Sequence, residues 1–349
     1  LEGGGVAQNV GSNYARQVNT LIGTKGVGLT SGYLYPGATY PYGMVQFTPS
    51  YFSKRSGFVI NQLSGGGCEH MGNFPTFPVK GKLKMSPDNI LNYRINISEE
   101  KGHAGYYEAK VQEDIHAKLT VTERTGMASY EYPADQQYGT VIIGGGISAT
   151  PIEQAAIVIT APNKCEGYAE GGNFCGLRTP YKVYFVAEFD TDALESGTWK
   201  RDELKPNTTF AEGEYSGVYF TFDVNKKKNI QYKIGVSYVS VENARENLKT
   251  ENSGWDFLQI QNQAESKWNH YLGKIEVEGS NPDRTTQFYT HLYRSFIHPN
   301  VCSDVNGEYM GADFRVHKSR SKHYTSFSNW DTYRCLLYTS PSPRDRTRS

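Results

Sequence analysis

Several features that would mark a specialised class of protein are missing from this sequence. The 349 residues include 36 basic and 36 acidic side chains, so the formal net charge is zero and no basic excess points to nucleic acid as a partner. No stretch approaches the ~20 consecutive apolar residues of a transmembrane helix, and the mean hydropathy is −0.58. We therefore expect neither nucleic acid binding nor a transmembrane segment and, from the length, about two domains.

Cysteine is scarce, with five residues and no C-x-x-C pair. No H-E-x-x-H segment is present either, and together these absences argue against a zinc site. Cys165 and Cys175 flank a glycine-rich stretch, and two alternatives remain open for them: a disulfide that closes a surface hairpin, or two free thiols in a loop. The eight histidines are scattered, which favours surface or structural roles over metal binding.

What the sequence does contain is glycine and tyrosine, with 36 and 26 residues, a composition typical of turn-rich β structure. From about 105 to 240 short segments alternate between apolar and polar residues. Leu119 and Val121 fall on one face of such a segment, and Lys118 and Thr120 fall on the other. Further strands are expected at 181–189, 217–222 and 230–239. This spacing predicts an antiparallel β-sandwich.

The period changes from strand-like to helix-like near residue 240. Ser240 can cap a first helix, 253–256 can open a second, and a third is expected to begin near Asp283. The apolar stripes expected on these helices are Val241, Ala244 and Leu248; Phe257, Ile260, Ala264, Trp268 and Leu272; and Phe288, Leu292 and Phe296. The switch predicts a domain boundary at 240, followed by a helical linker that leads into an α-domain.

Six segments, in order along the chain, resemble glycoside hydrolase family 92, the calcium-dependent exo-α-mannosidases. They are V-N-T-L-I-G-T (18–24), Y-P-G-A-T-Y-P-Y-G-M-V-Q-F-T-P (35–49), L-S-G-G-G-C (63–68), H-L-Y-R-S-F-I-H-P-N (291–300), S-D-V-N-G-E-Y-M-G (303–311) and F-S-N-W-D-T-Y-R (327–334). The resemblance implies an N-terminal β-sandwich followed by linker helices and the beginning of an (α/α)6 barrel.

This resemblance divides the chain into four parts. We expect a β-sandwich domain at 1–239, a helical linker at 240–282 and the truncated start of the (α/α)6 catalytic domain at 283–334. Residues 335–345 are identical to one translated frame of a common transposase sequencing adapter, so we expect 335–349 to be sequencing read-through.

The resemblance also implies the chemistry. Inverting glycosidases need a carboxylic acid and a carboxylate base ~6.5–9.5 Å apart, and the family adds Ca²⁺, a cation that prefers oxygen ligands. In the family the acid and the base lie in the part of the barrel beyond residue 334. We therefore expect a fragment of an exo-acting, inverting α-mannosidase that releases terminal mannose from glycans and is inactive as this chain.

Two other interpretations compete with this one. The first is a lectin-like β-sandwich that binds carbohydrate without hydrolysing it, and the second is a related (α/α)6 glycosidase or phosphorylase with another sugar. The long amphipathic helices after residue 240 favour an enzyme, because a binding module needs no linker and barrel helix. For the parent we expect a periplasmic or secreted bacterial enzyme, with the signal peptide absent from this chain, which begins at Leu1.

The N-terminal part offers four candidate substrate-binding residues. Gly66, Gly67 and Cys68 belong to a loop whose glycines would let backbone approach a ligand, although an ordinary turn would have the same sequence. Tyr40 belongs to a proline-rich segment with Tyr35 and Tyr42. Such rings can stack on a sugar, or they can pack in a domain interface.

The C-terminal part offers three more candidates: Trp330, Asp331 and Arg334. The resemblance places the aspartate in the subsite for the terminal mannose. The alternative is structural, since Ser328-x-x-Asp331 also matches a capping box. Upstream, Asn306-Gly307 favours a turn over an ion-binding loop, because the glycine is misplaced for an EF-hand. The residues that would bind calcium are not assigned.

Overall fold

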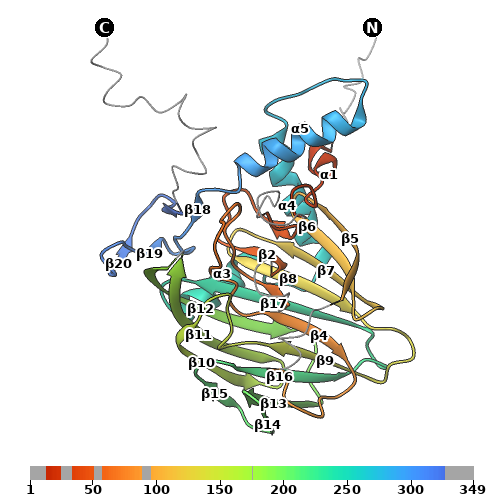
Figure 1. Cartoon of the computed structure of the whole chain (residues 1–349), viewed down its shortest axis with the longest axis vertical. Helices are drawn as coiled ribbons and strands as arrows, with labels where there is room; N and C mark the ends of the chain where they lie inside the picture. The colour runs from red at the N-terminus through yellow and green to blue at the C-terminus, as the bar shows by residue number, and fades with distance from the viewer. Residues whose placement is uncertain (1–12, 25–33, 51–56, 89–95, 175, 327–349) are drawn as a thin grey trace, which may run out of the picture.

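The computed structural model describes residues 13–24, 34–50, 57–88, 96–174 and 176–326. In this part of the chain two antiparallel sheets lie face to face, and three helices gather at one end of them (Figure 1). This arrangement confirms the predicted β-sandwich followed by helices. No helix among the described residues has the length and apolar character needed to cross a membrane.

The first sheet has eight strands in the order β1-β2-β3-β4-β9-β16-β13-β14. Every neighbouring pair is antiparallel. The strands are β1 (Ala38–Thr39), β2 (Gln46–Pro49), β3 (Phe58–Val59), β4 (Thr76–Lys80), β9 (Tyr138–Ile143), β13 (Glu195–Lys200), β14 (Glu203–Pro206) and β16 (Ser216–Asp223).

The second sheet has nine strands in the order β15-β10-β11-β12-β17-β8-β7-β6-β5, also antiparallel. These strands are β5 (Ile97–His103), β6 (Tyr106–Val111), β7 (Ile115–Val121), β8 (Thr125–Glu131), β10 (Ile152–Ala161), β11 (Lys164–Phe174), β12 (Leu177–Phe189), β15 (Phe210–Glu212) and β17 (Asn229–Ser237). The three strands expected at 181–189, 217–222 and 230–239 correspond to β12, β16 and β17.

Apolar side chains from both sheets fill the space between them. Aromatic rings form much of this core: Phe58 of the first sheet stacks on Tyr130 of the second with 6.3 Å between ring centres. Leu119 and Val121 of β7 point into the core as predicted. Thr120, expected on the exposed face, is buried instead, because helix α4 lies against that end of β7. Tyr107, Tyr132 and Tyr232 also belong to this core, where aromatic side chains bury large apolar areas.

Four helices are described: α1 (Tyr14–Gln17), α3 (Val241–Glu251), α4 (Phe257–Leu272) and α5 (Pro282–Ser295). The predicted cap of the first long helix is confirmed, since the Ser240 side chain accepts a hydrogen bond from the Asn243 amide. Asp256 caps α4 and Asn281 caps α5 in the same manner. The sequence signals for the starts of these helices are therefore local.

Helix α4 lies against the sandwich through the stripe expected from the sequence, with Ala264 and Trp268 buried. The indole Nε1 of Trp268 donates to the carbonyl of Thr39 at 2.7 Å. Gly105, with a φ of +85°, allows this close approach, because a Cβ there would lie 2.9 Å from the Cβ of Ala264. The helix is thus fixed to the sheets by both apolar contact and a buried hydrogen bond.

The stripe predicted for α5 is displaced by one residue. Phe288, Leu292 and Phe296 are only half-buried, whereas Tyr289 and Tyr293 are fully buried against α1 and α4. A shift of one residue rotates the buried face by about 100°. The Phe and Leu positions lie at the edge of the cluster, so the apolar surface of α5 is wider than the face it buries here.

The structure contradicts a disulfide between Cys165 and Cys175, because Cys165 is a free thiol. Cys165 is a free thiol, and the alternation along β11 turns it into the core, where burial raises its pKa. Cys175 lies outside the described residues. Cys302 is also a free, buried thiol, and Cys68 is disulfide-bonded.

A buried carboxylate joins the end of the sandwich to the helical region. Asp304 accepts hydrogen bonds from Ser237 at the end of β17 (2.6 Å) and from Asn243 (2.8 Å) and Asn247 (2.7 Å) of α3. Burial raises the pKa of Asp304, and these donors oppose the rise. The amide of Val305 returns a hydrogen bond to Asn247. Two segments, the end of β17 and helix α3, therefore donate to one carboxylate of a third.

Two two-stranded sheets complete the described chain: β18 (Asn300–Val301) pairs with β21 (Tyr324–Thr325), and between them β19 (Glu308–Met310) pairs with β20 (Val316–Lys318). The turn predicted at Asn306-Gly307 is confirmed. Gly307 has a φ of +87° and its amide donates to the carbonyl of Asp304. The turn presents Asp304 to α3.

Replacing Asp304 with alanine should lower the free energy of unfolding by about 2–4 kcal/mol, because two amides and a hydroxyl would lose their buried acceptor. Denaturant titration of the variant measures this loss. Asp313→Ala is the matched control: its carboxylate is half-exposed and bonds exposed His317 and the Arg315 amide, so the midpoint should move little. Equal midpoints for the two variants would contradict a central role for Asp304.

Candidate functional site

The loop that contains Gly66, Gly67 and Cys68 connects β3 with β4, and it folds around the buried ring of His70. The Leu63 amide donates to Nε2 of His70 at 2.8 Å, and Nδ1 of the same ring lies 2.7 Å from the carbonyl of Cys68. The two ends of the loop are thus held by one imidazole. We call residues 63–70 the glycine loop.

The three candidate residues have different surroundings within the glycine loop. Gly66 lies against the imidazole, since a Cβ there would be 2.8 Å from Cε1 of His70. Gly67 is exposed, and a Cβ there would meet nothing within 4 Å. Cys68 is half-buried and disulfide-bonded. The loop therefore presents backbone to solvent at Gly67 and is fixed on either side of it.

A second histidine connects the glycine loop to the segment after α5. The Ser64 amide donates to Nε2 of His298 at 3.1 Å, and Nδ1 of this ring lies 3.0 Å from Oδ1 of Asn300. The Asn300 amide in turn donates to the carbonyl of Gly43 at 2.8 Å. The loop, the proline-rich segment and the residues after α5 consequently meet at one place.

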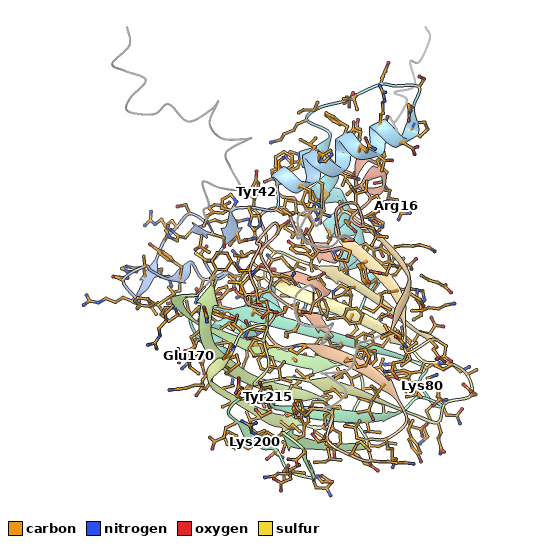
Figure 2. The ribbon with its side chains drawn as sticks, viewed as in Figure 1. Arg16, Tyr42, Lys80, Glu170, Lys200 and Tyr215 are labelled. Carbon is orange, nitrogen blue, oxygen red and sulfur yellow. The ribbon has the colours of Figure 1, made fainter. Side chains whose placement is uncertain are left out.

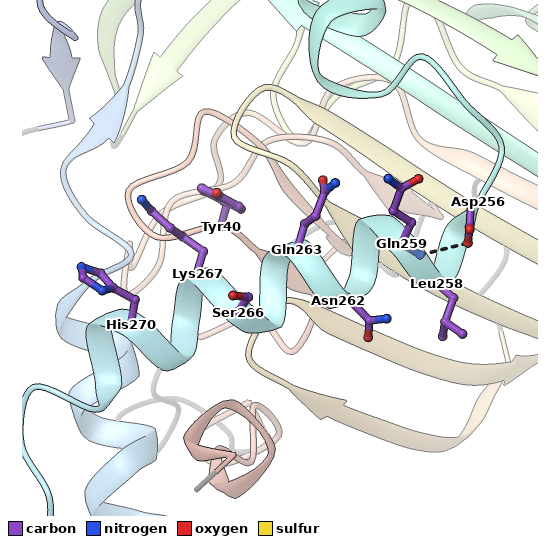
Figure 3. A pocket seen from close by; sticks show the side chains of 9 residues that line it. All are labelled: Tyr40, Asp256, Leu258, Gln259, Asn262, Gln263, Ser266, Lys267 and His270. Carbon is purple, nitrogen blue, oxygen red and sulfur yellow. Dashed lines mark hydrogen bonds between the residues drawn. The ribbon is translucent and has the colours of Figure 1, made fainter. Parts of the chain in front are cut away.

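Tyr40 lines a different surface, an open groove of about 780 Å³ along α4. Figure 3 shows its ring beside Lys267 and Gln263 of that helix. Burial, followed by the nearby carboxylates of Glu123 and Glu251, raises the pKa of Tyr40 to about 12. Its hydroxyl is therefore protonated at neutral pH and can both donate and accept.

The carboxylates of Glu123 and Glu251 both form ion pairs with Arg124. Nη1 of Arg124 contacts Glu251 at 2.6 Å and Glu123 at 2.7 Å, while its Nε donates to the carbonyl of Ser303 at 2.7 Å. Burial opposes the charge of Arg124, but the two carboxylates outweigh burial and raise its pKa. The ion pairs close the space between the sandwich, α3 and the residues before β19, next to Tyr40.

The neighbouring tyrosines are packing residues. Tyr35 is fully buried, and its carbonyl accepts from Nη1 of Arg294 at 3.1 Å. Tyr42, labelled in Figure 2, places its ring edge-on to Tyr271, Phe296 and Tyr324 at 5.8–6.3 Å. Its amide also donates to the carbonyl of Phe296. These contacts favour the interface alternative for Tyr35 and Tyr42.

The structure brings only some of the candidate substrate-binding residues close together. Gly66, Gly67 and Cys68 lie in one loop, and Tyr40 is linked to it indirectly through Gly43, Asn300 and His298. No residue of the glycine loop lines the groove beside Tyr40. The remaining candidates, Trp330, Asp331 and Arg334, lie outside the described residues.

Metal-ligating side chains do not cluster in the part of the chain that the structure describes, and its two buried acids are hydrogen-bonded. No group of three or more His, Cys, Asp or Glu side chains there is placed to hold an ion. The two buried acids are Asp304 and Glu265. The first is occupied by its three donors, and the second is bonded to Arg16 and Gln261. The described residues therefore offer no cluster of three or more such side chains to a calcium ion.

Sequence reasoning missed His70 and His298, which organise the glycine loop. A lone histidine carries no periodic signal, and the amide that His298 accepts from lies 234 residues away. The available signals were the position of His70 within the glycine loop and that of His298 within the segment 291–300.

Comparison with known families matches both parts of the chain. Residues 17–237 match the glycosyl hydrolase family 92 N-terminal domain, and residues 243–340 match the glycosyl hydrolase family 92 catalytic domain. The first match alone spans more than half of the chain.

Solved structures and a curated relative agree with this assignment. A family GH92 α-mannosidase from Bacteroides thetaiotaomicron is 26% identical with a TM-score of 0.81, over 92% of this chain and 46% of its own. An inverting GH92 mannosidase from the same organism has 24% identity and a TM-score of 0.79, over 94% and 46%. An uncharacterized secreted glycosidase from Arthroderma benhamiae is 26% identical over 87% of this chain and 43% of its own. This chain spans less than half the length of these relatives. It belongs to glycosyl hydrolase family 92 and contains the N-terminal domain and part of the catalytic domain of that family.

Proposed function

We propose that this chain is the N-terminal part of an exo-acting, inverting α-mannosidase that releases terminal mannose from glycans. The observation that carries the proposal is the match to both family domains in the family's order. The names of the two Bacteroides relatives support the substrate and the inverting outcome.

The structure favours an enzyme over a lectin-like sandwich. A sandwich that acts alone would expose its outer face to water, but here α4 covers the ends of β6–β8 with Trp268 fully buried. Asp304 likewise fixes α3 to the turn after β18. The sandwich therefore buries part of its surface against helices. A carbohydrate-binding module that acts alone does not need such helices.

In this proposal the described residues supply a wall of the sugar site and not the acid or base. Inverting hydrolysis needs one carboxyl group to protonate the leaving oxygen and another to activate water. Both buried acids described here are already bonded, so we place the catalytic pair outside the described residues. The exposed backbone at Gly67, next to Gly66 and Cys68, would face the mannose, with Tyr40 at a more distant point.

We further propose that the complete enzyme depends on Ca²⁺ and works outside the cytoplasm, in the periplasm or after secretion. The calcium ligands would come from outside the described residues, and when bound the ion would supply a positive charge for the sugar hydroxyls. The disulfide at Cys68 supports an oxidising compartment, as does the name of the Arthroderma relative.

The 349-residue chain alone should not release mannose, because a wall without an acid and a base transfers no proton. Incubation with an α-mannosyl oligosaccharide and chromatography of the products measures release. The same gene completed with its downstream sequence should release mannose and lose that activity in EDTA. Release by the 349-residue chain, or EDTA-resistant release by the completed enzyme, would contradict this part of the proposal.

In the completed enzyme, Asp331→Ala should reduce kcat/KM by roughly 30- to 1000-fold, equivalent to ~2–4 kcal/mol, if its carboxylate holds hydroxyls of the terminal mannose in the transition state. A capping role predicts instead a loss of ~1 kcal/mol in stability with nearly normal turnover. Melting curves and kinetics of both Asp331→Ala and Ser328→Ala separate the two, because the serine variant removes only the cap. Equal behaviour of the two variants, with turnover intact, would reject the subsite assignment.

A further inference from the structure

The glycine loop is held by two imidazoles that act in the same way. The consecutive amides of Leu63 and Ser64 donate to Nε2 of His70 (2.8 Å) and to Nε2 of His298 (3.1 Å). An amide N–H can only donate, so both Nε2 atoms must be unprotonated acceptors. The proton of each ring is then on Nδ1, where it is donated to the Cys68 carbonyl and to Oδ1 of Asn300.

This arrangement is incompatible with a second proton on either ring. A protonated imidazole is a donor at both nitrogens, so its Nε2–H would point at the backbone N–H that it now binds. His70 is buried, with the ring of Phe174 packed edge-on at 5.5 Å. Relief would therefore require the Leu63 end of the loop to move.

Electrostatics reinforces the geometry. Burial lowers the pKa of His70, and His298, a titratable group from the segment after α5, lowers it further. The hydrogen bond from the ring to the Cys68 carbonyl opposes this effect only in part. A histidine whose pKa is lowered in the fold stabilises the fold above its ordinary pKa of about 6.5 and loses that contribution as the pH falls below it.

Gly66 gives a second, independent indication that the ring positions the loop. A Cβ at Gly66 would lie 2.8 Å from Cε1 of His70, a distance that the packed ring does not allow. The next residue, Gly67, is exposed and has open space around its Cα. The imidazole thus sets the path of the backbone just before the point where it becomes accessible to a ligand.

We propose that His70 and His298 are positioning residues: their unprotonated Nε2 atoms hold the Leu63–Ser64 end of the glycine loop in the conformation that the mannose subsite requires. The proposal rests on the proposed function for the role of the loop, but the loop itself can be measured without any activity. It predicts that both histidines set the acidic limit of loop order and of turnover.

The test replaces both histidines with glutamine, whose side-chain oxygen can accept from the same amides but does not gain a proton. In the 349-residue chain, hydrogen exchange of Leu63 and Ser64 is followed from pH 7.5 to pH 5 as protection relative to intrinsic exchange. In the wild type, protection of these two amides should fall at least about tenfold more than that of the β8 amides. In His70→Gln/His298→Gln it should stay constant.

Two variants separate positioning from packing. His70→Phe fills the space without an acceptor, so it should lose protection at Leu63 at every pH, whereas a packing role predicts that Phe is tolerated at least as well as Gln. His317→Gln is the control, because exposed His317 belongs to β20, where it bonds Asp313, and should leave the pH dependence unchanged. Wild-type protection that persists at pH 5, or equal behaviour of the Phe and Gln variants, would overturn the proposal.

In the completed enzyme the same glutamine pair should shift the acidic limb of kcat/KM to lower pH while leaving kcat/KM at pH 7.5 within about twofold. An unchanged limb together with pH-dependent loop protection would overturn the link between the loop and the subsite. An enzyme without mannosidase activity would instead reject the proposed function, while the exchange experiment would still decide whether the histidines position the loop.

A last pair of variants tests the contact between the loop and the ring. Gly66→Ala should lower the thermal midpoint by several degrees and reduce protection at Leu63, because its methyl group displaces His70. Gly67→Ala adds the same methyl group in open space and should change neither quantity. Equal midpoints for the two variants would show that His70 does not fix the path of the loop.

Discussion

The carboxylate of Asp304 is the interaction on which the arrangement of the two regions depends. It is buried, and each of its three donors comes from the last strand of the sandwich or the first long helix after it. A buried carboxylate is costly unless such donors surround it, so the conformation that supplies all three is strongly preferred over its neighbours. Asp304 thereby fixes where the chain after β18 leaves the sandwich.

The remaining ties between the regions depend on that placement. With α3 in position, Glu251 at its end reaches Arg124, whose Nε binds the carbonyl of Ser303 just before Asp304. Trp268 then secures α4 at the other side through the Thr39 carbonyl. The two regions meet through hydrogen bonds with defined directions as well as apolar contact, and directional contacts determine orientation in a way that apolar area alone does not.

Local patterns in the sequence predicted the strands and helix starts, because the signals for these lie within a few residues. Ser240 and the amide it accepts from are three residues apart. The buried face of α5 could not be predicted as well, since the contacts with α1 and α4 bury Tyr289 and Tyr293 and leave the more apolar neighbouring stripe half-buried. The burial of Cys165 could have been predicted from the sequence. Cys165, Gly167 and Ala169 occupy every second position of β11 and therefore share its inward face, which favours a thiol in the core.

The candidate site shows the same division between local and distant information. The glycine loop can be recognised from its own composition, but the groups that shape it cannot, because one of its two acceptors comes from beyond α5. An imidazole in such a place differs from an amide side chain in one respect: its acceptor nitrogen is also its basic atom. A loop held in this way keeps its conformation only while the imidazole is unprotonated, so histidine in place of glutamine links the conformation of the backbone to the surrounding pH.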